Sequence, residues 1–154
     1  MTTAAVFDPI DPQYHQRVKT SFDRQGAMTT LQAVLAAVQP GVVDITFGHA
    51  QALTQQHGFL HAGMLATAMD SACGYAAFTL MAPGDAVLTI EFKINLLAPA
   101  RGDRFRAQGR VVKPGRTISV CEGHAYAIVG SEEKLIATMS CTLMCVKDRS
   151  DVAG

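Results

Sequence analysis

The sequence predicts an α+β fold in which an antiparallel sheet of about six strands wraps around one long central helix, with an extra amino-terminal helix. Residues 61–81 are rich in Ala, Met and Leu, as a helix requires, whereas the segments after them alternate apolar and polar residues as strands do. Short connections between those segments favour antiparallel pairing. Because the central helix is apolar nearly all round, the sheet must curl around it or a second subunit must cover it.

The amino-terminal part of the chain predicts a helix followed by a hairpin. Residues 11–25 have an amphipathic pattern that ends at Gly26, a residue typical of helix ends. Two apolar segments, 31–38 and 42–47, flank a Gln-Pro-Gly turn signal at 39–41. We therefore expect one helix and two paired strands ahead of the central helix.

The central segment, 61–81, is long enough to be compared with a membrane span. It is closed by Pro83 and Gly84, and Asp70 lies in its middle. A mid-span Asp costs roughly 2.5–3.5 kcal/mol on insertion scales, and many of the other residues are Ala, Gly, Ser or Thr. This composition favours a buried central helix of about five turns over a transmembrane helix.

Four strands are predicted after this helix. In the first, residues 88–96, the predicted buried face consists of Leu88, Ile90, Phe92, Ile94 and Leu96. The polar residues between them are Thr89, Glu91, Lys93 and Asn95. The other three strands span 104–111, 117–129 and 134–146, with a turn at 130–133 joining the last two.

Charge and cysteine content exclude several classes of protein. The 154 residues include 13 basic and 13 acidic side chains, so no basic field is available to hold nucleic acid or an anionic membrane. The four cysteines form no CxxC pair or disulfide framework, which indicates reduced core thiols in the cytoplasm. Residues 1–9 lack the basic start and apolar run of a signal peptide, and we expect a cytoplasmic protein.

The domain organisation follows from the same patterns. We expect residues 1–25 to be an amino-terminal extension with an amphipathic helix, 26–147 to be a single domain, and 148–154 to be a disordered tail. The window from Ile45 to Gly84 contains a single charged residue, Asp70.

Three stretches carry a resemblance to a known family: Gln55 to Gly63 (QQHGFLHAG), Asp70 to Ala72, and the segment 89–100 (TIEFKINLLAPA). Over about residues 25–147 the chain resembles the hotdog-fold acyl-CoA thioesterases of the PaaI type. The similarity includes the family's His-Gly-Gly block nine residues ahead of an Asp and its strand ending in Leu-x-Pro-Ala. It implies dimers that often form tetramers and hydrolyse acyl-CoA without metal or cofactor, CoA being part of the substrate.

The resemblance also implies roles for individual residues. Asp70 matches the catalytic carboxylate, which acts as general base or nucleophile, and Gln55 matches the amide that orients the carbonyl or the water. The backbone N–H of Ala62 matches the donor to the thioester oxygen, His61 a histidine that fixes this loop, and Thr89 a hydroxyl near the carboxylate.

The chemistry is consistent with these roles without reference to the family. Thioester hydrolysis needs a group that activates water or attacks directly, and donors aimed at the oxyanion. Asp70, removed from water on an apolar helix, suits the first task. The helix start at His61, Ala62 and Gly63 offers unpaired N–H groups and the positive end of the dipole for the second. Because Ala62 stands where the family usually has Gly, its N–H serves only at negative φ.

Other interpretations of these residues remain open. His57 and His61 have helical metal-ligand spacing but no acidic third ligand, Ser71 lacks a GxSxG elbow, and Cys73 suits packing. Asp70 is alternatively a structural carboxylate. The rival enzyme is a hydroxyacyl-thioester dehydratase of the same fold using His57 and Asp70, and the rival class is a non-catalytic acyl-thioester binder.

Basic residues near the strand ends suggest how CoA is held. Lys113 and Arg116 flank one loop, and Arg101 ends a neighbouring strand. The loop is alternatively a solvated turn. PaaI-type enzymes hold the CoA phosphates with basic residues on such loops, so the resemblance favours CoA binding by these three side chains.

Helix geometry predicts an active site shared between two chains. His61 and Asp70 are nine residues apart, which on a helix means about 13 Å of rise and opposite faces. One carbonyl cannot touch both. An antiparallel, two-fold pair of such helices would place the start of one beside the middle of the other, so we expect a homodimer with shared sites, assembled as a dimer of dimers.

Overall fold

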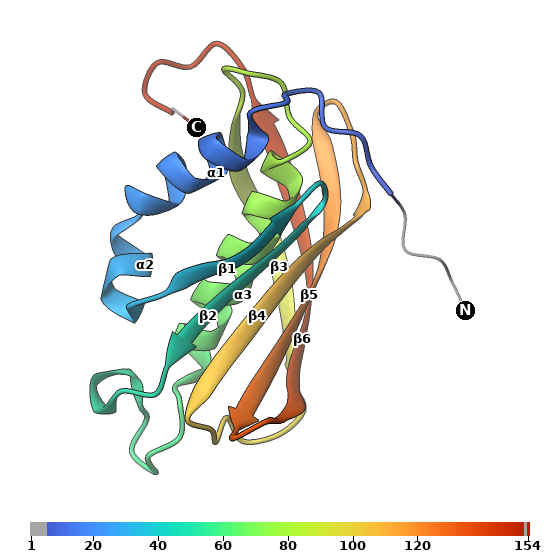
Figure 1. Cartoon of the computed structure of the whole chain (residues 1–154). Coiled ribbons are helices and arrows are strands. Elements are labelled where there is room, and N and C mark those ends of the chain that lie inside the picture. Colours follow the sequence, from blue (N-terminus) through green and yellow to red (C-terminus); the bar gives the residue numbers. More distant parts are fainter. Residues whose placement is uncertain (1–5, 153) are drawn as a thin grey trace.

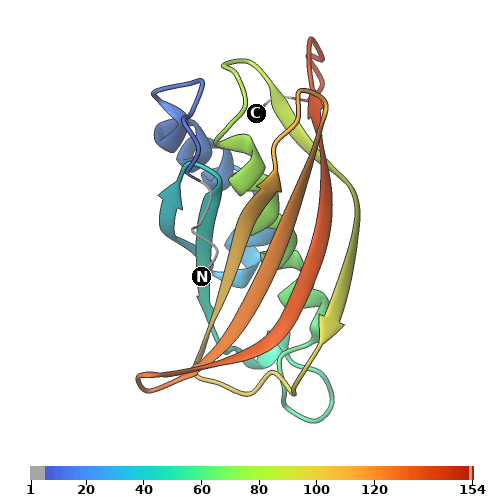
Figure 2. The same ribbon diagram turned by 90° about the vertical axis from the view of Figure 1, so that its right-hand side faces the viewer.

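The computed structural model describes residues 6–152 and 154, and its architecture confirms the predicted fold: a six-stranded antiparallel sheet wraps around one long helix (Figures 1 and 2). The helical elements are α1 (Tyr14–Asp23), α2 (Gly26–Leu31), the single 3-10 turn η1 (Gln51–Leu53) and the central α3 (Ala62–Phe78). The strands are β1 (Val34–Gln39), β2 (Val42–Gly48), β3 (Ala86–Leu96), β4 (Arg104–Lys113), β5 (Ile118–Val129) and β6 (Glu132–Val146). The sheet order is β1-β2-β4-β5-β6-β3.

The amino-terminal region differs from its prediction in one element. The predicted strand from residue 31 is wrong at its start, because residues 26–31 form α2 and β1 begins only at Val34. Gln32 ends α2 in the left-handed conformation, at φ 52°, and its N–H bonds to the carbonyls of Met28 and Thr29. This local cap keeps Leu31 in a helix, where its side chain is buried. Residues 1–5 of the predicted extension lie outside the described residues.

The central helix occupies the concave side of the curled sheet. α3 spans 17 residues, and its Ala-rich middle, from Ala68 onward, is almost completely buried. Figure 2 shows the sheet curving past it on one side. Over the described residues, no helix combines the length and the apolarity that crossing a bilayer requires.

Two glycines let α3 approach the sheet closely. Gly109 on β4 and Gly123 on β5 are direct cross-strand partners beneath the helix. A Cβ at Gly109 would overlap the backbone of Ala72 and Cys73, whereas one at Gly123 would lie 3.2 Å from the Cys73 sulfur. The sheet therefore meets backbone rather than side chain of α3 at Gly109, a contact that only glycine permits.

Arg17 attaches α1 to the carboxyl end of α3. Its guanidinium donates to the carbonyl oxygens of Phe78 at 3.1 Å, Met81 at 2.7 Å and Ala82, and stacks on the Phe78 ring at 4.4 Å. Asp11 lies 3.1 Å from its Nε. Phe78 is the last residue of α3, and Met81 and Ala82 lie in the turn that follows it. This half-buried cation therefore supplies donors at the carboxyl end of the helix, where intrahelical donors are lacking and the dipole is negative. The extension is thereby fixed to the central helix.

The predicted buried face of β3 is wrong in the single chain. β3 is an edge strand, and Leu88, Ile90, Phe92 and Leu96 are 43–55% exposed. The alternation is also interrupted, because the register with β6 shifts between Thr89 and Glu91. A free strand edge that carries exposed apolar side chains is a surface for pairing with another chain.

Substituting Gly109 tests the close packing of α3 on the sheet. We expect Gly109→Ala to lower the free energy of unfolding by at least about 1–3 kcal/mol, because the backbone of Ala72 and Cys73 cannot move away from the added methyl group. Urea denaturation measures the change. Gly26→Ala is the matched control, since open space surrounds Gly26; equal stability of the two variants would contradict the prediction.

Candidate active site

Asp70 lies on α3 with one carboxylate oxygen held by two donors. The Thr89 hydroxyl donates to Oδ1 at 2.7 Å, and the Cys141 thiol lies 3.8 Å from the same atom. Among the described residues, Asp70 takes part in no ion pair, and no third donor contacts its side chain. Its side chain is half-buried rather than fully buried, because it opens onto a cavity. The second oxygen, Oδ2, is therefore available for chemistry.

A β-bulge directs Thr89 toward Asp70. Strict alternation places Thr89 on the polar face of β3, opposite to Phe92. In the structure Thr89 pairs with Leu143 and Phe92 pairs with Cys141, and both partners are completely buried on the helix side of the sheet. The irregularity at Ile90 is what puts Thr89 and Phe92 on the same face.

The cavity beside Asp70 has a volume of about 130 Å³. Its lining comes from α3, from the start of β3 and from the amino-terminal extension: Ser21, Gln25, Asp70, Ser71, Gly74, Tyr75, Val87 and Thr89. Sequence reasoning missed Ser21 and Gln25. No local pattern in the extension marks them, since it is the Arg17 anchor that brings α1 against α3.

The amino terminus of α3 presents one free backbone donor. His61 is the N-cap, and its Nδ1 accepts the Gly63 N–H at 2.9 Å. The expectation that Gly63 offers an unpaired N–H is therefore wrong, because the cap uses it. Ala62 is the first helical residue and does not have positive φ, so its N–H can donate, and no acceptor contacts it within the part of the chain described.

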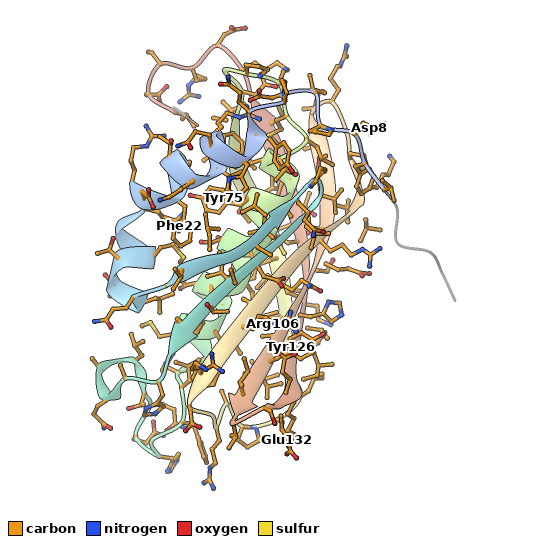
Figure 3. The ribbon with its side chains drawn as sticks, in the orientation of Figure 1. Asp8, Phe22, Tyr75, Arg106, Tyr126 and Glu132 are labelled. Carbon is orange, nitrogen blue, oxygen red and sulfur yellow. The ribbon has the colours of Figure 1, made fainter. Side chains whose placement is uncertain are left out.

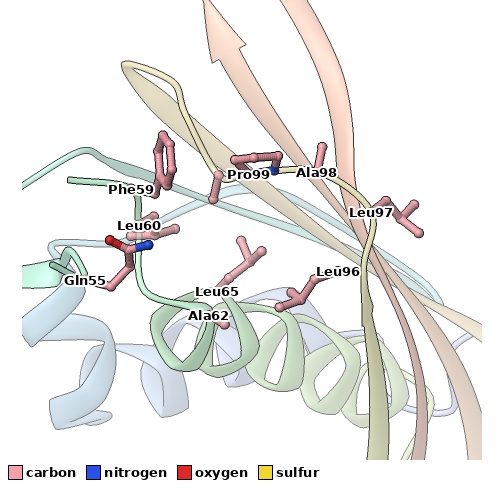
Figure 4. A pocket seen from close by; sticks show the side chains of 10 residues that line it. Gln55, Phe59, Leu60, Ala62, Leu65, Leu96, Leu97, Ala98 and Pro99 are labelled. Atoms are coloured by element: carbon pink, nitrogen blue, oxygen red, sulfur yellow. The ribbon is translucent and has the colours of Figure 1, made fainter. Parts of the chain in front are cut away.

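Gln55 lies beside this helix start in a second, larger pocket of about 460 Å³ (Figure 4). The other lining residues are largely apolar: Phe59, Leu60, Ala62, Leu65, Leu96, Leu97, Ala98, Pro99 and Ala100. The Gln55 Oε1 accepts the backbone N–H of His57, which fixes the amide and leaves its NH₂ group free to donate.

The two groups of candidate residues are separated within one chain. Gln55 and Ala62 line one pocket, Asp70 and Thr89 line the other, and the two linings share no residue. Ala62 and Asp70 are eight helical residues apart, about 12 Å of rise. A single chain therefore does not bring Gln55 and the Ala62 N–H to the same carbonyl as the Asp70 carboxylate.

The basic residues predicted to bind CoA do not form one cluster. Lys113 ends β4 and Arg116 follows it, whereas Arg101 lies before the start of β4, at the other end of the sheet (Figure 2). The three side chains therefore do not meet at one site of a single chain, since the ten residues of β4 separate Arg101 from the other two. Arg101 stacks 5.1 Å from the centre of the Phe59 ring, next to the Gln55 pocket.

The structure also shows where the residues of the alternative interpretations lie, namely the two histidines and Ser71. His57 and His61 are exposed, and His57 lines neither of the two pockets. The described residues contain no cluster of three or more His, Cys, Asp or Glu side chains that could hold a metal. The Ser71 hydroxyl donates to Gln25 at 2.8 Å.

All four cysteines are free and buried. A hydrogen bond with Cys141, together with burial, raises the pKa of the Cys73 thiol well above its ordinary value. Burial raises the pKa of Cys121 to about 12. These thiols remain protonated at neutral pH, so Cys73 and Cys121 are packing residues rather than nucleophiles.

Comparison with known proteins identifies the family. The model of the thioesterase superfamily matches residues 57–134, half of the chain. The chain belongs to the thioesterase superfamily. A crystal structure of a thioesterase family protein from Silicibacter pomeroyi is 54% identical to this chain, with a TM-score of 0.86. The match covers 87% of this chain and 98% of that one. This relationship confirms the predicted hotdog thioesterase fold.

More distant relatives have the same fold. The PaaI protein of the phenylacetic acid degradation operon of Escherichia coli is 19% identical, with a TM-score of 0.78 over 89% of this chain and 96% of that one. A curated protein of Saccharolobus solfataricus, whose name assigns it provisionally to the esterases, is 35% identical over 89 residues. That match spans 58% of this chain and only 59% of the relative's length.

The cap at His61 can be tested by stability. We expect His61→Ala to cost about 1 kcal/mol of folding free energy, because the Gly63 N–H loses its acceptor, and His61→Asn to retain most of it. Thermal unfolding measures both. His57→Ala is the control, since that exposed side chain caps no helix; a loss as large as that of His61→Ala would argue against the capping role.

Proposed function

We propose that this thioesterase hydrolyses an acyl-CoA to the free acid and CoA, with Asp70 as general base or nucleophile. The observation that carries the proposal is the environment of Asp70. It is the single charged residue between Ile45 and Gly84, and Thr89 holds one of its oxygens while the other opens onto a cavity. Family membership supports the reaction type.

In the proposed mechanism, the carboxylate either takes a proton from the attacking water and returns it to the leaving CoA sulfur, or attacks the thioester carbon itself and forms an anhydride. In the second route water then cleaves the anhydride, which releases the acid and restores Asp70, and its proton goes to the CoA sulfur. The Thr89 hydroxyl donates to the ionised carboxylate and keeps its orientation. The Ala62 N–H and the Gln55 amide donate to the carbonyl oxygen as it gains negative charge. CoA leaves as a thiol, and the reaction needs no metal or cofactor.

We propose that the active sites form between two copies of the chain. The support is the separation of the two linings and the free, apolar edge of β3. Antiparallel pairing through β3 would turn the partner end for end. The partner's Gln55 and Ala62 would then approach Asp70, giving two equal sites per dimer, and a dimer of dimers remains our expectation for the full assembly.

The same pairing accounts for the two groups of basic residues. Arg101 lies near the Gln55 pocket of its own chain. The loop with Lys113 and Arg116, at the opposite end of the sheet, would lie at the height of the partner's Gln55 pocket. We propose that all three side chains bind CoA phosphates, Arg101 at the site that contains the Gln55 pocket of its own chain and the pair Lys113 and Arg116 at the other site of the dimer.

The function is tested by a panel of acyl-CoA esters with detection of free thiol. We expect the wild-type protein to release CoA and Asp70→Asn to lose at least about a hundredfold in kcat while remaining folded. Water addition to an enoyl-CoA without thiol release would instead indicate the dehydratase. Binding without turnover would indicate an acyl-thioester binder.

Subunit mixing tests the shared site. Gln55→Ala and Asp70→Asn, each nearly inactive alone, should regain roughly a quarter of wild-type activity when refolded together. Half of the randomly mixed dimers are mixed, and each of these has one site free of both substitutions. If mass spectrometry verifies mixing and activity stays at the sum of the two variants, the site lies within one chain.

Phosphate binding is tested with Lys113→Ala/Arg116→Ala. We expect a higher KM for acyl-CoA with little change in kcat, because phosphate contacts are equally good in ground and transition states. The matched substrate is the same acyl group on N-acetylcysteamine, which has no phosphate and should show no change. Unchanged KM for acyl-CoA would leave this loop a solvated turn, and Arg101→Ala would then be measured alone.

A further inference from the structure

The cavity beside Asp70 is unusually polar for the interior of this protein. At its inner end Tyr75 is 4% and Ser71 8% exposed, and the Ser21 hydroxyl lies 3.3 Å from the Tyr75 hydroxyl. Figure 3 shows Tyr75 next to Phe22, where α1 crosses α3. Buried polar groups are costly unless they are hydrogen-bonded, so their presence at this position needs a reason.

The hydrogen bonds within the lining leave donors unused. Ser71 donates to Gln25 Oε1 at 2.8 Å, which leaves the Gln25 NH₂ group free to donate. Ser21 and Tyr75 share one hydrogen bond, so one of their two hydroxyl protons is free as well. Burial raises the pKa of Tyr75, which keeps its phenol protonated. The lining contains no Lys or Arg among the described residues, so the cavity suits a neutral acceptor.

The dimensions of the cavity limit what it can hold. Its volume of about 130 Å³ is less than a third of the 460 Å³ of the Gln55 pocket, so it favours a short acyl group over a long chain. Tyr75 follows Asp70 by five helical residues, about 7–8 Å along α3. A group whose carbonyl lies at Asp70 therefore reaches the Ser21 and Tyr75 hydroxyls with a chain of about six atoms.

Resting on the proposed hydrolysis at Asp70, we infer that this cavity selects a short acyl group with a neutral hydroxyl or keto group at the end far from the thioester, read by Ser21, Gln25 and Tyr75. The amino-terminal extension thus supplies specificity. Arg17 holds α1 on the end of α3, and Ser21 follows one helical turn later. The apolar pocket of Gln55 has no comparable polar end.

The test compares kcat/KM for hexanoyl-CoA, 6-hydroxyhexanoyl-CoA and dodecanoyl-CoA. We expect the wild-type protein to favour the hydroxylated ester over hexanoyl-CoA by about tenfold, and dodecanoyl-CoA to be the poorest substrate. Ser21→Ala/Tyr75→Phe should abolish the preference by lowering kcat/KM for the hydroxylated ester alone. Tyr75→Phe keeps the ring against Phe22 and Phe78, and circular dichroism verifies folding.

The control variant is Tyr126→Phe, which removes a phenol hydroxyl from a ring that packs on Arg106, outside the cavity, and should keep the wild-type preference. Equal rates for the hexanoyl and hydroxyhexanoyl esters, or an unchanged preference in the double variant, overturn the inference and leave the proposed function intact. Faster hydrolysis of dodecanoyl-CoA also overturns it, since the acyl group would then occupy the Gln55 pocket. Failure to hydrolyse any of the esters overturns both.

Discussion

The closest contact between the central helix and the sheet determines where the site residues lie. Ala72 and Cys73 rest with their backbone against Gly109, and the neighbouring Gly123 makes room for the Cys73 sulfur. This contact sets the depth of α3 and its rotation about its axis. Asp70, less than one turn earlier, is consequently directed past the rim of the sheet toward β3, where Thr89 contacts it.

The two ends of α3 are stabilised in different ways, and each way has a chemical consequence. At the amino end, His61 accepts the hydrogen bond of the Gly63 N–H and leaves the N–H of Ala62 free for a ligand. At the carboxyl end, Arg17 donates to the carbonyl of Phe78, the last residue of α3, and to the Met81 and Ala82 carbonyls in the turn after it. The first arrangement leaves the backbone donor that our proposed mechanism uses, and the second brings a polar face of α1 to the cavity of Asp70.

Within a single chain the candidate site residues stay apart, and the length of α3 is the physical reason. A helix of 17 residues is too long for its start and its middle to meet one carbonyl, so the donors and the carboxylate open into different pockets. The same chain leaves β3 unpaired, with apolar side chains exposed. A second copy would resolve both problems at once, which is why we place the proposed sites between chains.

The sequence by itself determined the elements and the identity of the central groups. Composition predicted a helix over 61–81, observed as 62–78. Period-two patterns and turn signals predicted five of the six strands closely, because all of these signals arise from neighbouring residues. The isolation of Asp70 in an uncharged window and the QQHGFLHAG stretch identified the candidate site. Those features needed no knowledge of which segments meet in space.

Only the tertiary structure decided how these groups are arranged. The bulge at Ile90 turns Thr89 to the helix side, although strict alternation predicts the opposite. The capping of Gly63 by His61, and the distance between Arg101 and Lys113, depend on turns and on strand length rather than on residue type. Ser21 and Gln25 join the cavity because Arg17 reaches across about 60 residues of sequence to the end of α3. Such long-range contacts leave no periodic signal in the sequence.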